Sequence, residues 1–319
     1  MGSTQPPLRL LFRRGPPLRR RHRLSPSAAD LAPAAGFAGA KVNLYLHVGA
    51  LGADGYHPID SLMLFADVGD RLTATPAPAF SLTVSGPFAG ATPVSPANLV
   101  WRAARTLHEA PGLAIHLDKI LPVAAGIGGG SADAAAALRL VNQALKLGFN
   151  SQRLQDIGVG LGADVPACVG SVPVVARGRG EQLSPAPRLP EIHAVLVNPG
   201  VAVPTGPIFA AFDAGPLPGT LDPRLPAAFD TVQDLATWLT TKTRNDLQAA
   251  ALSLAPAAGE AIDILGASSL TLLARMSGSG ATAFALCAKA PDAQALAAAV
   301  RTARPNWWVA CCRLGGPWG

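Results

Sequence analysis

The amino-acid sequence predicts an α+β fold built in two lobes. Strand-like and helix-like segments are mixed along the chain, without the strict strand–helix–strand alternation of a parallel sheet. The length of 319 residues exceeds what one hydrophobic core usually supports. A proline-rich run near 182–192 interrupts the pattern and is the predicted boundary. We therefore expect one domain at 36–182 and a second at 190–319, preceded by an extension at 1–35.

The predicted extension is rich in arginine and proline, a composition typical of disorder. Residues 1–29 hold seven arginines and no acidic residue, which explains the chain's net charge of +6. The remainder is nearly neutral, so we expect no nucleic-acid partner. No apolar run is long enough to predict a membrane partner. Residues 1–30 are either a plastid-type targeting segment or the product of an upstream start, and we expect a cytoplasmic protein.

Apolar periodicity predicts the secondary structure. We expect strands at 36–48, 60–68, 71–75, 80–84, 113–117, 173–180, 193–197, 270–276, 281–287 and 307–313. We expect helices at 98–109, 131–147, 151–160, 207–212, 229–239, 245–254, 257–266 and 291–302. The strands at 71–75 and 80–84 are predicted to form a hairpin. Polar residues interrupt the alanine-rich helix at 131–147, which predicts a surface or half-buried helix. The run 215–226 holds four prolines and two glycines and predicts a loop.

The segment Pro122–Ala132 (PVAAGIGGGSA) joins a predicted strand to a predicted helix. Glycine lets the backbone approach a ligand closely, and a helix N-terminus offers unpaired N–H groups and partial positive charge. Together these features predict a phosphate site and hence nucleotide binding. A Walker A loop is excluded because no lysine follows Gly130, and a dinucleotide fingerprint is disfavoured because Ser131 stands at its last glycine position. The alternative is a glycine-rich turn without a ligand.

Three ordered segments make the chain resemble the GHMP kinases. They are Gly39–Leu44 (GAKVNL), Pro122–Ala132 and Ser277–Ala281 (SGSGA). Finer matches at Ala53–His57 (ADGYH) and Leu161–Pro166 (LGADVP) resemble the branch whose acceptor is a cytidine diphosphate-linked methylerythritol. The resemblance implies an N-terminal lobe like domain 2 of ribosomal protein S5, a ferredoxin-like C-terminal lobe and an active site in the cleft between them.

The resemblance also implies the reaction, which is ATP-dependent phosphorylation of the 2-hydroxyl of that alcohol in the non-mevalonate route to isoprenoids. ATP is then a co-substrate that carries Mg²⁺, and the partner is a small molecule bound by a monomer or weak homodimer. ATP binding is implied for Pro122, Val123, Ala124, Ala125, Gly126, Ile127, Gly128, Gly129, Gly130, Ser131, Ala132 and Asn98. The alanines at 124, 125 and 132, Ile127, and Gly39 depart from residues common in the family.

The catalytic residues implied by the resemblance are Asp164, as acceptor of the hydroxyl proton, and Lys41, which keeps that carboxylate ionised and stabilises charge. From the residues alone, Asp164 is equally a cap or turn residue, and Lys41 an exposed edge-strand lysine. Ser131 either caps its helix or faces Mg²⁺ or phosphate. Asn98 is a good N-cap and, by the resemblance, lies near the adenine.

The acceptor site implied by the resemblance places Phe209 and Tyr56 against the cytosine, with His57 and Asn43 at its polar edge. Thr205, in the segment before Phe209, is included in this site. The other histidines, His47, His108, His116 and His193, are expected to be structural. The four cysteines lack metal-binding spacing, so we expect no protein metal site and no disulfide framework. Two other functions stay open, a homoserine or mevalonate type of small-alcohol kinase and a non-catalytic ligand-binding relative.

Overall fold

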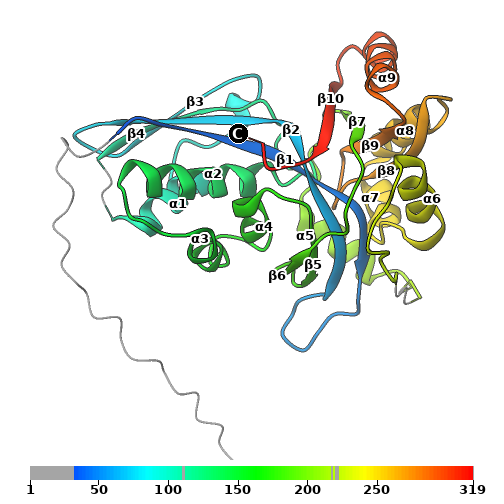
Figure 1. The fold of residues 1–319 in the computed structure, drawn as a ribbon, viewed down its shortest axis with the longest axis horizontal. Helices are drawn as coiled ribbons and strands as arrows, with labels where there is room; N and C mark the ends of the chain where they lie inside the picture. The colour runs from blue at the N-terminus through cyan, green and yellow to red at the C-terminus, as the bar shows by residue number, and fades with distance from the viewer. Residues whose placement is uncertain (1–31, 110–111, 217, 220–222, 319) are drawn as a thin grey trace, which may run out of the picture.

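A computed structural model describes residues 32–109, 112–216, 218–219 and 223–318. It has two lobes that share one ten-stranded sheet, with helices packed against it (Figure 1). The predicted two-lobed α+β fold is thus confirmed. The predicted extension at 1–35 lies outside the described residues up to residue 31, and Ala34 and Ala35 already belong to the first strand.

The N-terminal lobe is organised around a long antiparallel pair, β1 (Ala34–Val48) and β2 (Ile59–Pro76). Its other strands are β3 (Ser81–Ser85), β4 (Leu113–Asp118), β5 (Val174–Gly178) and β6 (Gln182–Pro185). β4 and β5 each pair with β2, and β6 pairs with β5. β6 falls inside the proline-rich boundary run, so the N-terminal sheet continues beyond residue 182. The domain limits remain a prediction.

The hairpin predicted from 71–75 and 80–84 is wrong. β2 continues without a break through residue 76, and β3 pairs in parallel with β4 rather than with β2. The segments predicted as separate strands at 60–68 and 71–75 are one strand, and between them the Asp70 carboxylate is fully buried and accepts hydrogen bonds from the backbone N–H groups of Ile120 and Leu121. A satisfied buried carboxylate can remain within a strand.

Helices α1 (Leu99–Leu107), α2 (Gly129–Ala144), α3 (Ser151–Gly158) and α4 (Val165–Gly170) lie together against this sheet (Figure 1). Ten of the sixteen residues of α2 are buried, so the expectation of a surface or half-buried helix is wrong. Its alanines allow close packing on β1, where Gly36 lies beside Ala136. Two of its polar residues have partners in other segments: Arg139 donates to the carbonyls of Cys168 and Phe37, and Asn142 Nδ2 donates to the Phe149 carbonyl.

The C-terminal lobe contains β7 (Ile192–Asn198), β8 (Thr271–Met276), β9 (Ala283–Cys287) and β10 (Trp308–Gly315). Its helices are α5 (Thr205–Asp213), α6 (Val232–Lys242), α7 (Gln248–Leu254), α8 (Pro256–Gly266) and α9 (Ala290–Ala303). The last strand, β10, pairs with β7 along its length and with the middle of β2 at its end. The end of the chain therefore joins the two lobes.

Two irregularities in β1 position the site. The register between β1 and β2 shifts between Gly39 and Lys41, and again between Asn43 and Tyr45. Such bulges bend a strand and redirect its side chains. Lys41 and Asn43 are two residues apart and share one face of the strand, and the bulges on either side set the direction of that face.

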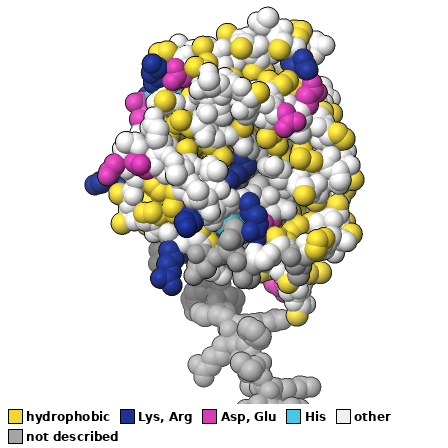
Figure 2. Space-filling view, turned by 90° about the vertical axis from the view of Figure 1, so that its right-hand side faces the viewer, with side chains coloured by type: hydrophobic (Ala, Val, Ile, Leu, Met, Phe, Trp, Pro, Cys, Tyr) yellow, Lys and Arg dark blue, Asp and Glu magenta, His cyan; other side chains and the backbone are white. Residues whose placement is uncertain are grey.

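The surface of the C-terminal side mixes apolar atoms with charges of both signs (Figure 2). Within the described ranges, no single helix has the length and apolar character needed to cross a bilayer. The pair α7 and α8, bent by 120° at its junction, meets those two criteria together.

Candidate active site

A cavity of about 1460 Å³ lies beside β1 and contains most of the predicted site residues. Those that line it are Lys41, Asn43, Tyr56, His57, Ala124, Ala125, Gly126, Gly128, Gly129, Gly130, Ser131, Asp164, Thr205 and Phe209. The predicted ATP residues Pro122, Val123, Ile127, Ala132 and Asn98 do not line it. The fold thus brings together segments that are widely separated in the chain.

Lys41 and Asp164 face each other in this cavity. Lys41 Nζ lies 3.0 Å from Asp164 Oδ2, with side chains 6% and 31% exposed. The alternative of an exposed edge-strand lysine is therefore wrong. Asp164 precedes α4 but makes no side-chain capping bond, so a helix cap does not explain this residue either. The carboxylate pairs with a buried cation and keeps one side open to the cavity.

Asn43 fixes the direction of the lysine side chain. Lys41 Nζ donates to Asn43 Oδ1 at 2.8 Å, and Asn43 Nδ2 donates to Ser61 Oγ at 2.7 Å. Ser61 Oγ in turn donates to the Tyr45 carbonyl at 2.6 Å. A buried chain of hydrogen bonds in which each polar group has a partner is rigid, so the ammonium group is held in one place.

The glycine-rich segment forms a cradle at the start of α2. Gly126 and Gly128 have φ values of +74° and +63°, which side chains other than glycine rarely adopt. A Cβ on Gly128 would lie 3.1 Å from Lys41 Cε, and one on Gly126 would lie 2.5 Å from the Ser277 carbonyl oxygen. The cradle therefore packs against both the Lys41–Asp164 pair and the second glycine-rich loop, Ser277–Ala281. Its N–H groups at the helix start suit an anion.

Two predictions for the helix starts had different outcomes. Ser131 is not the cap of α2, because the helix begins at Gly129 and its N-cap is Gly128; its side chain lines the cavity. Asn98 is the N-cap of α1, as predicted, and accepts from Val100 N at 2.8 Å. Its Nδ2 donates to the Pro93 carbonyl, so the amide is already used and its proximity to adenine stays a prediction.

The far end of the cavity is aromatic. The rings of His57 and Phe209 stack with centroids 5.1 Å apart and planes at 29°. His57 Nδ1 lies 2.9 Å from the Gly49 carbonyl oxygen, and its Nε2 lies 3.3 Å from Asp213 Oδ1. Asp213, which the sequence analysis missed, comes from the end of α5 and also lines the cavity.

Tyr56 occupies the mouth of the cavity and is 53% exposed. The guanidinium of Arg179, another residue that the sequence analysis missed, lies 4.0 Å from the centre of its ring. Thr205 is also at this opening, with its Oγ1 3.2 Å from Ser279 Oγ. The exposed aromatic ring and the stacked pair deeper inside provide flat apolar surface for a ring of a ligand.

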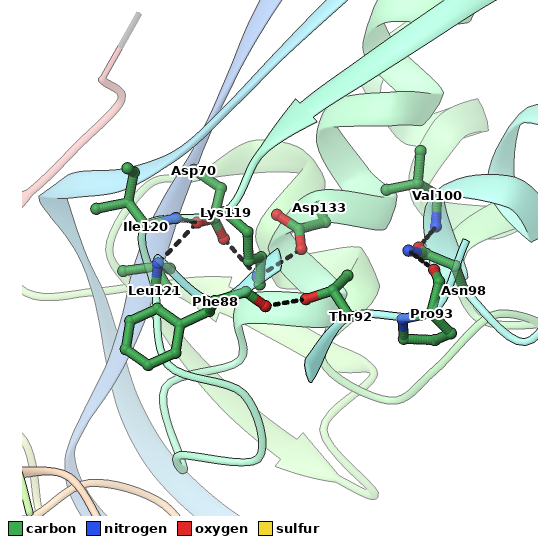
Figure 3. Close-up of polar contacts among 10 residues, drawn as sticks. All are labelled: Asp70, Phe88, Thr92, Pro93, Asn98, Val100, Lys119, Ile120, Leu121 and Asp133. Atoms are coloured by element: carbon green, nitrogen blue, oxygen red, sulfur yellow. Dashed lines mark hydrogen bonds and ion pairs between the residues drawn. The ribbon is translucent and has the colours of Figure 1, made fainter. Parts of the chain in front are cut away.

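A buried charge cluster beneath the cradle was also missed. Lys119 Nζ lies 2.6 Å from one carboxylate oxygen of Asp70 and 2.6 Å from one of Asp133 (Figure 3). A Cβ on Gly129 would lie 3.2 Å from Lys119 Nζ, so the cation sits directly under the cradle. The cluster ties β2, the segment before the cradle and α2 together. Nothing local marks these residues as partners, because they come from three separate segments.

The protonation of this cluster follows from its burial. Burial alone would lower the pKa of Lys119, but the two carboxylates outweigh it and raise that pKa. Burial raises the pKa of Asp133 to about 8, against the opposing effect of Lys119. One cation therefore faces two carboxyl groups, and burial favours the protonated form of Asp133.

Sequence comparisons show which known proteins this chain is similar to. The profile of the GHMP kinases N terminal domain matches residues 98–171, and that of the GHMP kinases C terminal domain matches residues 227–306. The 4-diphosphocytidyl-2-C-methyl-D-erythritol kinase of Caulobacter sp. (strain K31) is 52% identical over 287 residues, which is 88% of this chain and 98% of the relative. The same kinase of Dinoroseobacter shibae is 48% identical, covering 87% and 94%.

Comparison with solved structures leads to the same family as the sequence comparisons. A crystal structure of 4-(cytidine 5'-diphospho)-2C-methyl-D-erythritol kinase superposes with a TM-score of 0.70 at 32% identity, covering 89% of this chain and all of the other. Homoserine kinase from Cytophaga hutchinsonii gives a TM-score of 0.61 at 18% identity, with 89% and 94% covered. That second match shows a shared fold only.

The buried cluster predicts a pH-dependent stability. A carboxyl group in the unfolded chain titrates near the ordinary value of 3.8, whereas Asp133 in the folded chain titrates near 8. Between these values the folded state binds more protons, so the free energy of unfolding falls as the pH rises from about 4 to about 8. Asp133→Asn removes this contribution. Wild type should therefore lose stability relative to the variant across that range, as measured by urea unfolding at several pH values.

Asp156→Asn, at an exposed position in α3, is the matched control and should follow wild type at every pH. Parallel stability curves for wild type and Asp133→Asn would contradict the assignment of a proton to Asp133.

Proposed function

The chain belongs to the GHMP kinase family, in the branch of the 4-diphosphocytidyl-2-C-methyl-D-erythritol kinases, and we propose that it transfers the γ-phosphoryl group of ATP to the 2-hydroxyl of 4-diphosphocytidyl-2-C-methyl-D-erythritol. This reaction belongs to the non-mevalonate route to isoprenoid precursors. The observation that carries the proposal is the Lys41–Asp164 pair, which lies between the glycine cradle and the aromatic end of one cavity. The cradle suits the phosphates of ATP, and the aromatic end suits a cytosine.

The proposed chemistry requires little of the protein beyond position and charge. Asp164 accepts the proton of the acceptor hydroxyl, and its open side in the cavity leaves room for that group. Lys41 pairs with this carboxylate and stabilises negative charge on the transferred group. The N–H groups at the start of α2 bind the phosphate oxygens.

Magnesium would enter with ATP. Among the described residues no three histidine, cysteine or acidic side chains group as metal ligands. Few protein ligands are needed for an ion that is held mainly by the phosphates of the nucleotide, as Mg²⁺ usually is. The Ser131 hydroxyl and the Asp164 carboxylate are the cavity groups that would face it, and the ion would neutralise phosphate charge. We also propose a cytoplasmic location and a monomer or weak homodimer.

An acceptor screen tests the function. Purified protein with Mg·ATP should phosphorylate 4-diphosphocytidyl-2-C-methyl-D-erythritol and should leave homoserine and mevalonate unchanged, because neither carries a base for the aromatic end of the cavity. Activity on homoserine or mevalonate alone would replace the proposal with another small-alcohol kinase. Binding of ATP and acceptor without turnover would indicate a non-catalytic relative.

Removing either member of the catalytic pair should abolish most turnover. Asp164→Asn and Lys41→Ala are each expected to lower kcat at least about a hundredfold, since a proton acceptor or a charge-stabilising group is lost. ATP should still bind, because the cradle is formed by backbone. Steady-state kinetics and ATP titration measure the two effects separately.

Exposed residues of the same types provide the controls. Asp156→Asn in α3 and Lys242→Ala in α6 should keep wild-type kcat. Near-normal turnover in Asp164→Asn or Lys41→Ala would exclude the corresponding role.

Phe209→Ala should weaken acceptor binding by about 1–2 kcal/mol, the scale of an aromatic stacking contact. The KM for ATP should not change, because Phe209 lies at the aromatic end of the cavity. Phe209→Tyr keeps the ring and should remain close to wild type. An unchanged acceptor affinity in Phe209→Ala would remove this residue from the acceptor site.

A further inference from the structure

Arg179 lies in the tight turn between β5 and β6, at the edge of the cavity. Gly178 and Gly180 on either side have φ values of +68° and +116°, so the turn depends on glycine at both positions. The Arg179 N–H donates to Glu181 Oε2 at 2.7 Å. Because the β5–β6 pair is anchored on β2, the turn is held in place and presents the arginine side chain to the cavity.

The cations of the cavity are few. Of the lysine and arginine side chains in the described part of the chain, Lys41 and Arg179 line it. Lys41 is already engaged by Asp164 and Asn43. Arg179 is also paired, with Asp54, but both of these side chains are about half exposed, so the guanidinium can exchange this partner for a ligand.

The position of Arg179 matches one part of the proposed acceptor. On one side its guanidinium covers the ring of Tyr56. On the other side the next residue, Gly180, abuts the loop before the catalytic aspartate, since a Cβ there would lie 3.5 Å from the Ala163 carbonyl oxygen. The turn that carries Arg179 therefore contacts both Tyr56, the residue expected at the base, and the loop that precedes Asp164. In the acceptor, the group between the base with its ribose and the alcohol is the diphosphate.

The negative charge of the acceptor's diphosphate requires a cation in the cavity. The N–H groups of the cradle serve the phosphates of ATP, but the diphosphate of the acceptor is a second polyanion in the same cavity. Asp54, Glu181, Asp164 and Asp213 also line the cavity and would repel it. Without a cation between the base and the hydroxyl, this repulsion would be uncompensated.

We propose that Arg179 binds the diphosphate of the acceptor and so helps to select a nucleoside diphosphate-linked alcohol over a neutral one. This inference rests on the function proposed above. An arginine can bind phosphate oxygens through two parallel hydrogen bonds. Its present ion pair with Asp54, at 2.7 Å, joins two half-exposed side chains, and an ion pair so open to solvent contributes little to stability. A diphosphate can therefore replace Asp54 as the partner.

The test compares ligands with and without the diphosphate. Cytidine and cytidine diphosphate are titrated by calorimetry into the full chain with saturating ADP, which occupies the cradle. Wild type should bind cytidine diphosphate more tightly than cytidine. In Arg179→Ala the affinity for cytidine diphosphate should fall about tenfold to a hundredfold, as for loss of charge-assisted hydrogen bonds. The affinity for cytidine should not change.

Kinetics supply a second readout. Arg179→Ala should raise the KM for the acceptor by a similar factor, with the KM for ATP unchanged and kcat close to wild type. Arg179→Lys should recover part of the loss because it keeps the charge.

Arg177→Ala is the matched control. Arg177 is on the same hairpin, is 50% exposed and pairs with Asp60 at 2.8 Å, but it does not line the cavity. The Arg177→Ala substitution should leave the affinities for cytidine and for cytidine diphosphate at wild-type values.

The outcomes are distinct. An equal loss of cytidine and cytidine diphosphate affinity in Arg179→Ala would mean that the arginine only holds Tyr56, and it would overturn the proposal. No loss of either would overturn it as well. If wild type neither bound these cytidine ligands nor phosphorylated the acceptor, the proposed function itself would be wrong.

Discussion

The ion pair between Lys41 and Asp164 is the contact on which the rest of the site depends. An ammonium group that is 6% exposed is strongly unfavourable unless a carboxylate and further acceptors replace its water. Asp164 and Asn43 supply these, but only when β1, the cradle and the start of α4 come together. Gly128 permits this approach, because a Cβ there would lie 3.1 Å from Lys41 Cε. Folding of the site and burial of the lysine are thus one event.

The two ends of the cavity are held in different ways. Beneath the cradle, Lys119 and its two carboxyl partners are almost fully buried, so their contacts exchange with water only when the structure opens. At the aromatic end, Arg179 and Asp54 are half exposed, and such a pair reforms easily with another partner. The cradle therefore has a fixed geometry, whereas the contacts at the aromatic end are easier to rearrange.

The errors in the sequence analysis share one cause. The break predicted between residues 68 and 71 and the exposure predicted for α2 both fall at polar residues, which usually contact water. In the structure Asp70 is satisfied by backbone N–H groups and by Lys119, and Arg139 by carbonyl oxygens of other segments. Partners so distant in the chain cannot be identified from a local pattern.

The sequence by itself determined the order and type of most elements, the glycine cradle at a helix start and the ordered motifs that identify the family. These depend on local periodicity, glycine and helix-end chemistry, which act over a few residues. Only the packing of the whole chain brings Lys41 to Asp164, places Lys119 under the cradle and sets the turn that carries Arg179 against Tyr56 and the loop before Asp164. Such contacts are set by the packing of segments far apart in the chain, and no short-range rule specifies them.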